Sequence, residues 1–145
     1  MSLKKIFSDF KPFQHGVGKV LGHLEADIME IVWNKEKVSV REVYEQLNLN
    51  REIAYTTVMT IMGRLAEKNI LTKEPRGNAY VYSPTLSKDE FTSRMVSNVI
   101  DGLLEDYADA AFAHFINKIG NADHKKIANL EALLSQYKAK EEIDD

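Results

Sequence analysis

The side chains with the clearest chemical potential lie on one face of a helix predicted over residues 54–67. At about 100° per residue, Thr56, Thr60 and Gly63 share the side opposite the apolar stripe, with Met59 beside them. A merely solvated helix face usually carries long charged side chains, whereas these are small or short. Threonine hydroxyls donate or accept hydrogen bonds, and threonine methyls pack on the thymine methyl group. This face therefore predicts close contact with base edges in a DNA groove.

Further candidates for DNA contact flank this face. Tyr55 is expected to hydrogen-bond a phosphate at the helix start, and Arg51, just before it, is expected to clamp the DNA backbone. Arg76 lies at the tip of a predicted hairpin, where an arginine can enter the minor groove or hold a phosphate. The complete set of predicted DNA-binding residues is Arg51, Tyr55, Thr56, Thr57, Met59, Thr60, Gly63, Arg76 and Asn78.

No comparable pattern supports catalysis or metal binding. The histidines, His15, His23, His114 and His124, stand apart in the sequence, and no HxH, HExxH or GxSxG motif occurs. The chain has no cysteine, which excludes disulfides, thiol redox chemistry and cysteine metal clusters, since each requires the sulfur atom. We therefore expect a protein that is not an enzyme and that uses no metal and no cofactor.

Two shorter helices are predicted before the 54–67 helix. Apolar residues at helical spacing indicate a helix over 24–34, and a Ser39–Glu42 capping box opens another over 40–48. The polar stretch 48–50 joins that second helix to the third, which gives a helix-turn-helix. The core stripe of the third helix is formed by Val58, Ile61, Met62, Leu65 and Ala66.

A hairpin is predicted directly after the third helix. Residues 70–74 and 79–83 are typical of short strands, and Pro75-Arg76-Gly77-Asn78 between them is typical of a tight turn. The predicted fold class is therefore mainly α with a small β-hairpin. It is a winged helix-turn-helix in which the third helix is the recognition helix and the hairpin is the wing.

Beyond Pro84 the sequence predicts three more helices with wide apolar faces. A second capping box, Ser87–Glu90, opens a helix that runs to about residue 104, and helices over 107–119 and 123–140 follow. Together they show more apolar surface than so small a unit buries alone. We therefore expect a dimerisation region with contacts from Phe91, Met95, Val99, Leu103, Phe112, Phe115, Leu130 and Leu134. The alternative is that these helices fold back and complete the core of a monomer.

The predicted domains are an N-terminal arm at 1–20, a winged helix at 21–85 and a helical dimerisation region at 86–145. The net charge is −3, but its sign is segregated along the chain. Four Lys against one Asp give the first region +3, and five basic against three acidic groups give residues 51–76 a charge of +2. Attraction to phosphate depends on such local patches more than on the total charge.

The sequence contains no candidate membrane span. No apolar run approaches the ~18 residues that a transmembrane helix needs, and the opening residues lack the apolar stretch of a secretory signal. We therefore expect a cytoplasmic protein.

The chain resembles the penicillinase and methicillin-resistance repressor family (BlaI/MecI type), which also includes copper-responsive CopY-type repressors. Four stretches carry the resemblance, in the family's order: LGHLEADIMEIVW, SVREVYEQL, AYTTVMTIMGRLAEKNIL and RGNAYVYSP. It extends from Leu21 to about Phe115. The resemblance implies a homodimeric winged-helix repressor that binds an inverted-repeat operator in double-stranded DNA, with the C-terminal helices forming the dimer.

The chain departs from the family pattern at two places. Copper-responsive members end in a cysteine-containing metal motif, which a chain without cysteine does not form. In penicillinase-type members a sensor system cuts an Asn-Phe bond in the dimerisation region, and the similar position here is His114-Phe115. Control by cleavage is therefore not implied, and the inducing signal and any sensor or protease partner stay open.

Other readings also stay open from the sequence. A winged helix used as a protein-interaction module would bind no DNA in a salt-sensitive way, and a small-molecule-sensing winged-helix regulator would need a pocket that no motif marks. At the residue level, the threonines could be a solvated face, and Arg64 could be a salt-bridge partner of Glu67 or Glu30.

Overall fold

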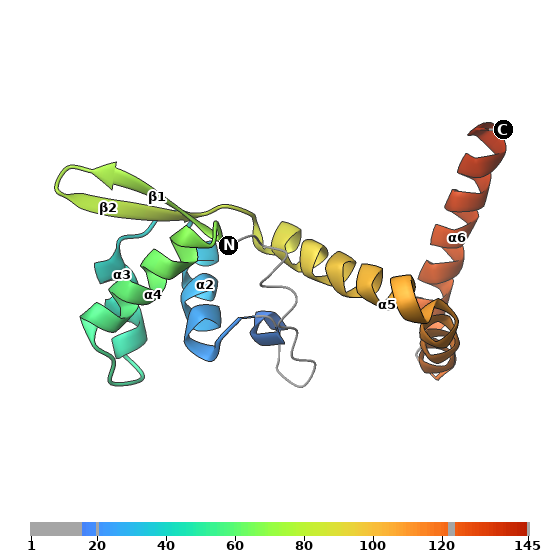
Figure 1. The fold of residues 1–145 in the computed structure, drawn as a ribbon, viewed down its shortest axis with the longest axis horizontal. Coiled ribbons are helices and arrows are strands. Elements are labelled where there is room, and N and C mark those ends of the chain that lie inside the picture. Colours follow the sequence, from blue (N-terminus) through green and yellow to red (C-terminus); the bar gives the residue numbers. More distant parts are fainter. Residues whose placement is uncertain (1–15, 20, 122–123, 145) are drawn as a thin grey trace. The chain divides into compact units, whose positions relative to one another are not determined.

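The computed structural model of the protein describes residues 16–19, 21–121 and 124–144 (Figure 1). Most of the predicted N-terminal arm therefore lies outside the described residues. The chain forms two compact units, one that ends at Ile100 and one that begins at Asp101, and each is described by itself.

The first unit is a winged helix. Figure 1 shows its three helices α2, α3 and α4 gathered on one side of the hairpin. Every helix and strand predicted between residues 24 and 83 is confirmed, with ends that shift by one or two residues. The elements are η1 (Gly16–Lys19), α2 (His23–Lys35), α3 (Val40–Asn48), α4 (Tyr55–Glu67), β1 (Leu71–Arg76), β2 (Ala79–Pro84) and the start of α5 (Lys88–Gly120).

Both predicted capping boxes form. The Glu42 backbone N–H donates to Ser39 Oγ at 3.1 Å, and the Ser39 N–H donates to Glu42 Oε1 at 3.2 Å, which fixes the start of α3. At the start of α5 the Glu90 N–H donates to Ser87 Oγ at 3.1 Å, and the Ser87 N–H donates to Glu90 Oε1 at 3.5 Å. Each box satisfies backbone donors that a helix start otherwise leaves without partners.

A Schellman turn connects α4 to the hairpin. The Ile70 N–H donates to the Leu65 carbonyl at 2.9 Å, and the Asn69 N–H donates to the Ala66 carbonyl at 3.0 Å. Asn69 takes the left-handed conformation (φ 64°) that this motif requires, and asparagine tolerates it better than most residues. The chain therefore passes from α4 into β1 within a few residues.

The hairpin turn is shorter than predicted. The strands pair antiparallel as far as Arg76 and Ala79, so the turn consists of Gly77 and Asn78 alone. Gly77 has a φ of 66°, which a two-residue hairpin turn requires and which glycine adopts without strain. The prediction that the turn begins at Pro75 is wrong, because β1 is an edge strand, where a residue without an N–H is tolerated.

A short bridge fastens the connection between α2 and α3 to the hairpin. The Val38 N–H donates to the Tyr82 carbonyl at 2.9 Å, and the Tyr82 N–H donates to the Val38 carbonyl at 2.7 Å. Both side chains are buried. The residue before the bridge, Lys37, is thereby held beside the outer edge of β2.

The core of the first unit draws on every element of that unit. Val58, Met62 and Leu65 of α4 are each 0% exposed, which confirms the predicted core stripe at these positions. Val17 of η1 and Leu21 are also buried in this core. The end of the predicted N-terminal arm is therefore part of the folded unit.

The start of α5 belongs to this core as well. Phe91 and Met95, expected in the dimer contact, are 1% and 8% exposed, so they are buried within one chain. The Phe91 ring lies 5.5 Å from the ring of Trp33 on α2, measured between centroids. Assigning these two residues to the dimer contact is corrected, because helical periodicity marks a buried face without saying what buries it.

The second unit contains the rest of α5 and α6 (His124–Asp144). Tyr107 has non-helical backbone angles inside α5 (φ −133°, ψ 35°), close to the break that the sequence predicts after residue 104. None of the side chains described from Asp101 onward is buried. The large apolar side chains exposed in this unit are Leu103, Leu104, Tyr107, Phe112, Phe115, Ile116, Leu133, Leu134 and Tyr137.

Truncating Phe91 tests its place in the core. Phe91→Ala should lower the free energy of unfolding of the first unit by about 3–5 kcal/mol, because it removes a buried ring and leaves a cavity. Urea unfolding followed by fluorescence of Trp33, the only tryptophan, reports on this unit directly. Leu49→Ala is the control: its side chain is 81% exposed, so the change should stay within about 0.5 kcal/mol. Equal losses in the two variants would contradict the assignment.

Candidate nucleic-acid interface

The outward face of α4 brings the predicted threonines together. Thr56, Thr57 and Thr60 are exposed, and with Ile61 and Arg64 they line a shallow depression on the helix surface. Because the opposite side of α4 is fully buried, the helix is held with this face toward solvent. The result is a row of hydroxyl and methyl groups with a guanidinium beside it.

Arg64 belongs to this face, although sequence reasoning did not include it. Of the two partners considered for it, Glu30 pairs with Lys88 instead, at 2.9 Å between Nζ and Oε2. Within the described chain Arg64 forms no salt bridge. The spacing of Thr56, Thr60 and Arg64, each four residues apart, is the signal that could have identified it.

Gly63 leaves open space on the same helix. A Cβ atom added there would have no heavy atom within 4 Å apart from the adjacent residues and the nearby backbone of the same helix. Packing therefore does not require glycine at this position. A glycine inside a helix costs about 1 kcal/mol relative to alanine. The fold therefore carries this cost without a packing reason.

The N-terminus of α4 has no side-chain cap. Ala54 occupies the N-cap position and makes no side-chain hydrogen bond to the helix, and no acidic residue lies in the first turn. Tyr55 is 40% exposed, and its ring meets Tyr44 edge-on with the centroids 5.6 Å apart. The helix start thus presents backbone N–H groups, the positive end of the helix dipole and an oriented phenol, all of which favour an anion.

Arg51 is tied to α2 instead of reaching freely outward. Its guanidinium forms an ion pair with Asp27, which also lies 3.8 Å from His23 Nε2. The Arg51 and Asp27 side chains remain 39% and 32% exposed, and ion pairs in such settings are worth about 0–1 kcal/mol. The ion pair braces the connection between α3 and α4.

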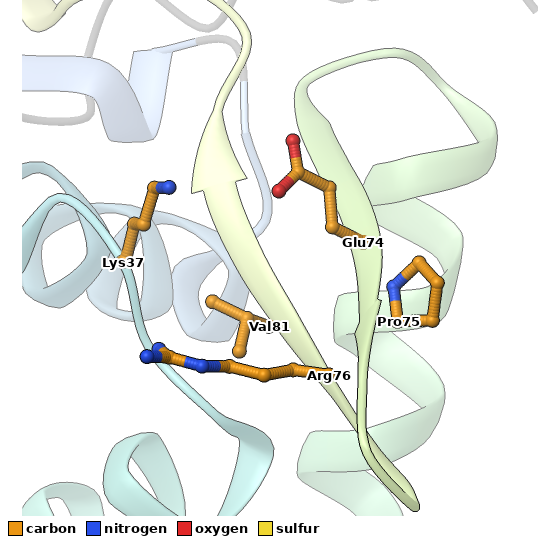
Figure 2. Close-up of a pocket in the computed structure, with 5 residues that line it drawn as sticks. All are labelled: Lys37, Glu74, Pro75, Arg76 and Val81. Atoms are coloured by element: carbon orange, nitrogen blue, oxygen red, sulfur yellow. The ribbon is translucent and has the colours of Figure 1, made fainter.

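Two positively charged side chains line a hollow on the outer face of the hairpin. Lys37, Glu74, Pro75, Arg76 and Val81 line it. Figure 2 shows the Arg76 side chain extending past Val81 toward the segment that carries Lys37. Arg76 therefore extends across β2 and does not project from the turn, where Asn78 is exposed. In the described chain no salt bridge joins Glu74 to either cation.

Lys37 is a second residue that sequence reasoning missed. It lies in the connection between α2 and α3, far from the hairpin in sequence, and the Val38–Tyr82 bridge brings it to the wing. No local pattern could have indicated this, because the pairing joins segments that are distant along the chain.

The remaining predicted dimerisation residues are not buried. Leu103, Phe112 and Phe115 on α5 and Leu134 on α6 are exposed, with 46–58% of each side chain open to solvent. Val99 and Leu130 are half-buried. These apolar side chains have no core of their own in the described chain.

Within the described residues, no group of three or more His, Asp or Glu side chains is placed to hold a metal ion. No helix in the same part of the chain is long and apolar enough to cross a membrane.

The comparison with known families decides the class of protein. A sequence model of the family described as penicillinase repressor matches residues 21–136. The chain belongs to the penicillinase repressor family. Members of this family are transcriptional repressors and not enzymes. The match covers the winged helix, α5 and part of α6, so the assignment extends across both units.

Two curated relatives agree with this assignment to the penicillinase repressor family. The transcriptional regulator BlaI of Mycobacterium tuberculosis is 35% identical over 119 residues, which are 77% of this chain and 86% of that protein. The penicillinase repressor of Staphylococcus aureus is 25% identical over 116 residues, which are 80% of this chain and 91% of that one. Among solved structures, the DNA-binding domain of the repressor BlaI is 24% identical, with a TM-score of 0.43, and covers 46% of this chain and 82% of that one.

Proposed function

We propose that this protein is a cytoplasmic transcriptional repressor that binds double-stranded DNA sequence-specifically, as a homodimer on an inverted-repeat operator. The observation that carries the proposal is the outward face of α4, where short hydroxyl side chains stand exposed beside a hairpin wing. Membership of the penicillinase repressor family supports the same conclusion.

The face of α4 suits the major groove. Helical rise is ~1.5 Å per residue, so Thr56 to Arg64 spans about 12 Å, or roughly three to four base pairs. Recognition helices present their N-terminal half to base edges, which is where Thr56 and Thr60 lie. We assign base contacts to these threonines, with Met59 on the flank, and a backbone contact to Arg64.

Phosphate contacts then arise on both sides of the helix. The uncapped start of α4 and the Tyr55 hydroxyl face one strand, and Arg51 joins them by exchanging Asp27 for a phosphate. On the other side the wing supplies Arg76 and Lys37 from the hollow of Figure 2. Such contacts position the duplex and leave sequence readout to α4.

A homodimer accounts for the exposed apolar side chains of the second unit. Leu103, Phe112 and Leu134 would be covered by the same surface of a second copy, as in a two-fold interface. A two-fold axis also sets two recognition helices at a fixed separation, and operator half-sites then lie a whole number of DNA turns apart, about 10 bp each.

Selection of bound sequences from random DNA duplexes tests the whole proposal. Enrichment of an inverted repeat would support the DNA partner, the sequence readout and the two-fold symmetry together. A protein-interaction module would enrich no sequence and would show no salt-sensitive affinity for DNA.

Thr60 provides a test of base readout. Thr60→Ala should cost about 1–3 kcal/mol at one base pair per half-site and relax the base preference there. Thr92→Ala is the matched control, because the Thr92 hydroxyl donates to the Lys88 carbonyl of its own helix at 3.0 Å. Selection profiles for both variants give the measurement. A Thr60→Ala profile identical to that of the parent would place the reading surface elsewhere.

The wing cations provide a test of backbone contact. Arg76→Ala and Lys37→Ala should each weaken specific and non-specific binding about equally and reduce the slope of log K against log salt by about 0.9. Lys138→Ala on α6, also exposed, should leave the slope unchanged. If Arg76→Ala weakens only one sequence, Arg76 reads bases or groove width instead.

The proposed dimer is tested by placing charge on the exposed apolar side chains of the second unit. Leu103→Asp combined with Leu134→Asp should give a monomer by sedimentation, since a carboxylate in an apolar interface loses its hydration. The first unit should stay folded by Trp33 fluorescence, and operator affinity should fall by about two to four orders of magnitude because avidity is lost. Leu49→Asp, on the first unit, should remain dimeric. A double variant that stays dimeric would exclude this interface.

A further inference from the structure

The junction between the wing and α5 is short and held from several sides. Only Thr85, Leu86 and Ser87 separate β2 from α5. The Thr85 N–H donates to the Ile70 carbonyl at 3.0 Å, and Ser87 caps the helix through Glu90. The segment that joins β2 to α5 is therefore held by hydrogen bonds and is not an unconstrained linker.

Side chains of α2 fix the direction of that departure. Trp33 Nε1 donates to the Leu86 carbonyl at 3.0 Å, across 53 residues of sequence. The Trp33 ring also packs against Phe91, and Lys88 pairs with Glu30 at 2.9 Å. These contacts hold the connecting segment at Leu86, the first residue of α5 at Lys88 and its first turn at Phe91. All of them lie within the first unit.

The hydrogen bond has a different role from the ring contact. Trp33 is only partly buried, and the apolar contact with Phe91 would be kept by a phenylalanine at position 33. The hydrogen bond from the Trp33 indole N–H to the Leu86 carbonyl, by contrast, depends on angle as well as distance. It therefore fixes the orientation of the connecting segment.

We infer that Trp33 is a positioning residue that sets the exit direction of α5 and, through it, the half-site spacing that the dimer accepts. The inference rests on the proposed dimeric operator binding. From Lys88 to Ile100 the helix spans about 18 Å, so a swing of about 10° at its base moves its far end by about 3 Å, close to the ~3.4 Å rise of one base pair. Trp33 touches neither the outer face of α4 nor the wing hollow, so this effect is separate from contact with DNA.

The experiment measures spacing preference in the full chain. Duplexes carry the half-sites found by selection, at the selected spacing and at spacings one and two base pairs shorter or longer, and one duplex carries a single half-site. The parent should prefer one spacing by about tenfold or more. Trp33→Phe should reduce this preference to within about threefold while its affinity for the single half-site stays that of the parent.

Glu30→Gln supplies a second variant, because it weakens the ion pair with Lys88 on the same junction without touching the core. Its preference should broaden in the same direction, and Glu131→Gln, an exposed carboxylate on α6, should behave as the parent. Circular dichroism confirms folding of each variant. If Trp33→Phe fails to fold, Trp33→Leu, which also lacks the indole donor, takes its place: a broadened profile supports the inference and an unchanged profile overturns it.

The outcomes separate this inference from the proposed function. A parent with a sharp spacing preference that folded Trp33→Phe retains would overturn the positioning role alone. A parent without any spacing preference would overturn the proposed dimeric binding and the positioning role with it.

Discussion

The structure depends first on the burial of one side of α4. Val58, Met62 and Leu65 are completely withdrawn from solvent, which fixes the rotation of the helix about its own axis. The orientation of the opposite face follows from that rotation, because a helix turned by one residue, or about 100°, would bring Thr57 and Arg64 to the buried sites of Val58 and Leu65 and expose part of the core. The left-handed turn at Asn69 then sends the chain directly into β1. The outward face of α4 and the wing are thus positioned by the same packing.

The electrostatics are local. With a net charge of −3 the chain as a whole does not attract DNA, and screening limits each exposed charge to about 8 Å at physiological ionic strength. What matters is that Arg64 lies on the outward face of α4 and that Lys37 and Arg76 share one hollow on the wing. Arg51 is held by an exposed ion pair that is weak enough to be exchanged. A protein of this kind would gain comparatively little from non-specific attraction, so the contacts of α4 with bases would carry more of its preference.

Much of the winged helix could be predicted from the sequence, because helical period, capping boxes and turn residues are local signals. The exposed face of α4 with Thr56 and Thr60 was predicted from the same helical period. What failed was non-local: Lys37 reaches the wing only through strand pairing with distant residues, and Phe91 and Met95 share one apolar stripe with residues that stay unburied. An apolar stripe identifies which face of a helix is buried. Which part of the protein covers each turn of that face depends on how the rest of the chain folds. The Trp33 hydrogen bond to Leu86 was unpredictable for the same reason.

One helix, α5, serves both units, and this links the two parts of the proposed mechanism. Its first turns are held in the core of the first unit, whereas from Asp101 onward its apolar side chains have no core in the described chain. The non-helical residue Tyr107 lies on the far side of this boundary. An event that disrupts the second unit therefore need not unfold the first. For a dimeric repressor, separation into two intact readers is sufficient for release, because each reader then binds its half-site without the effective concentration that the partner supplied.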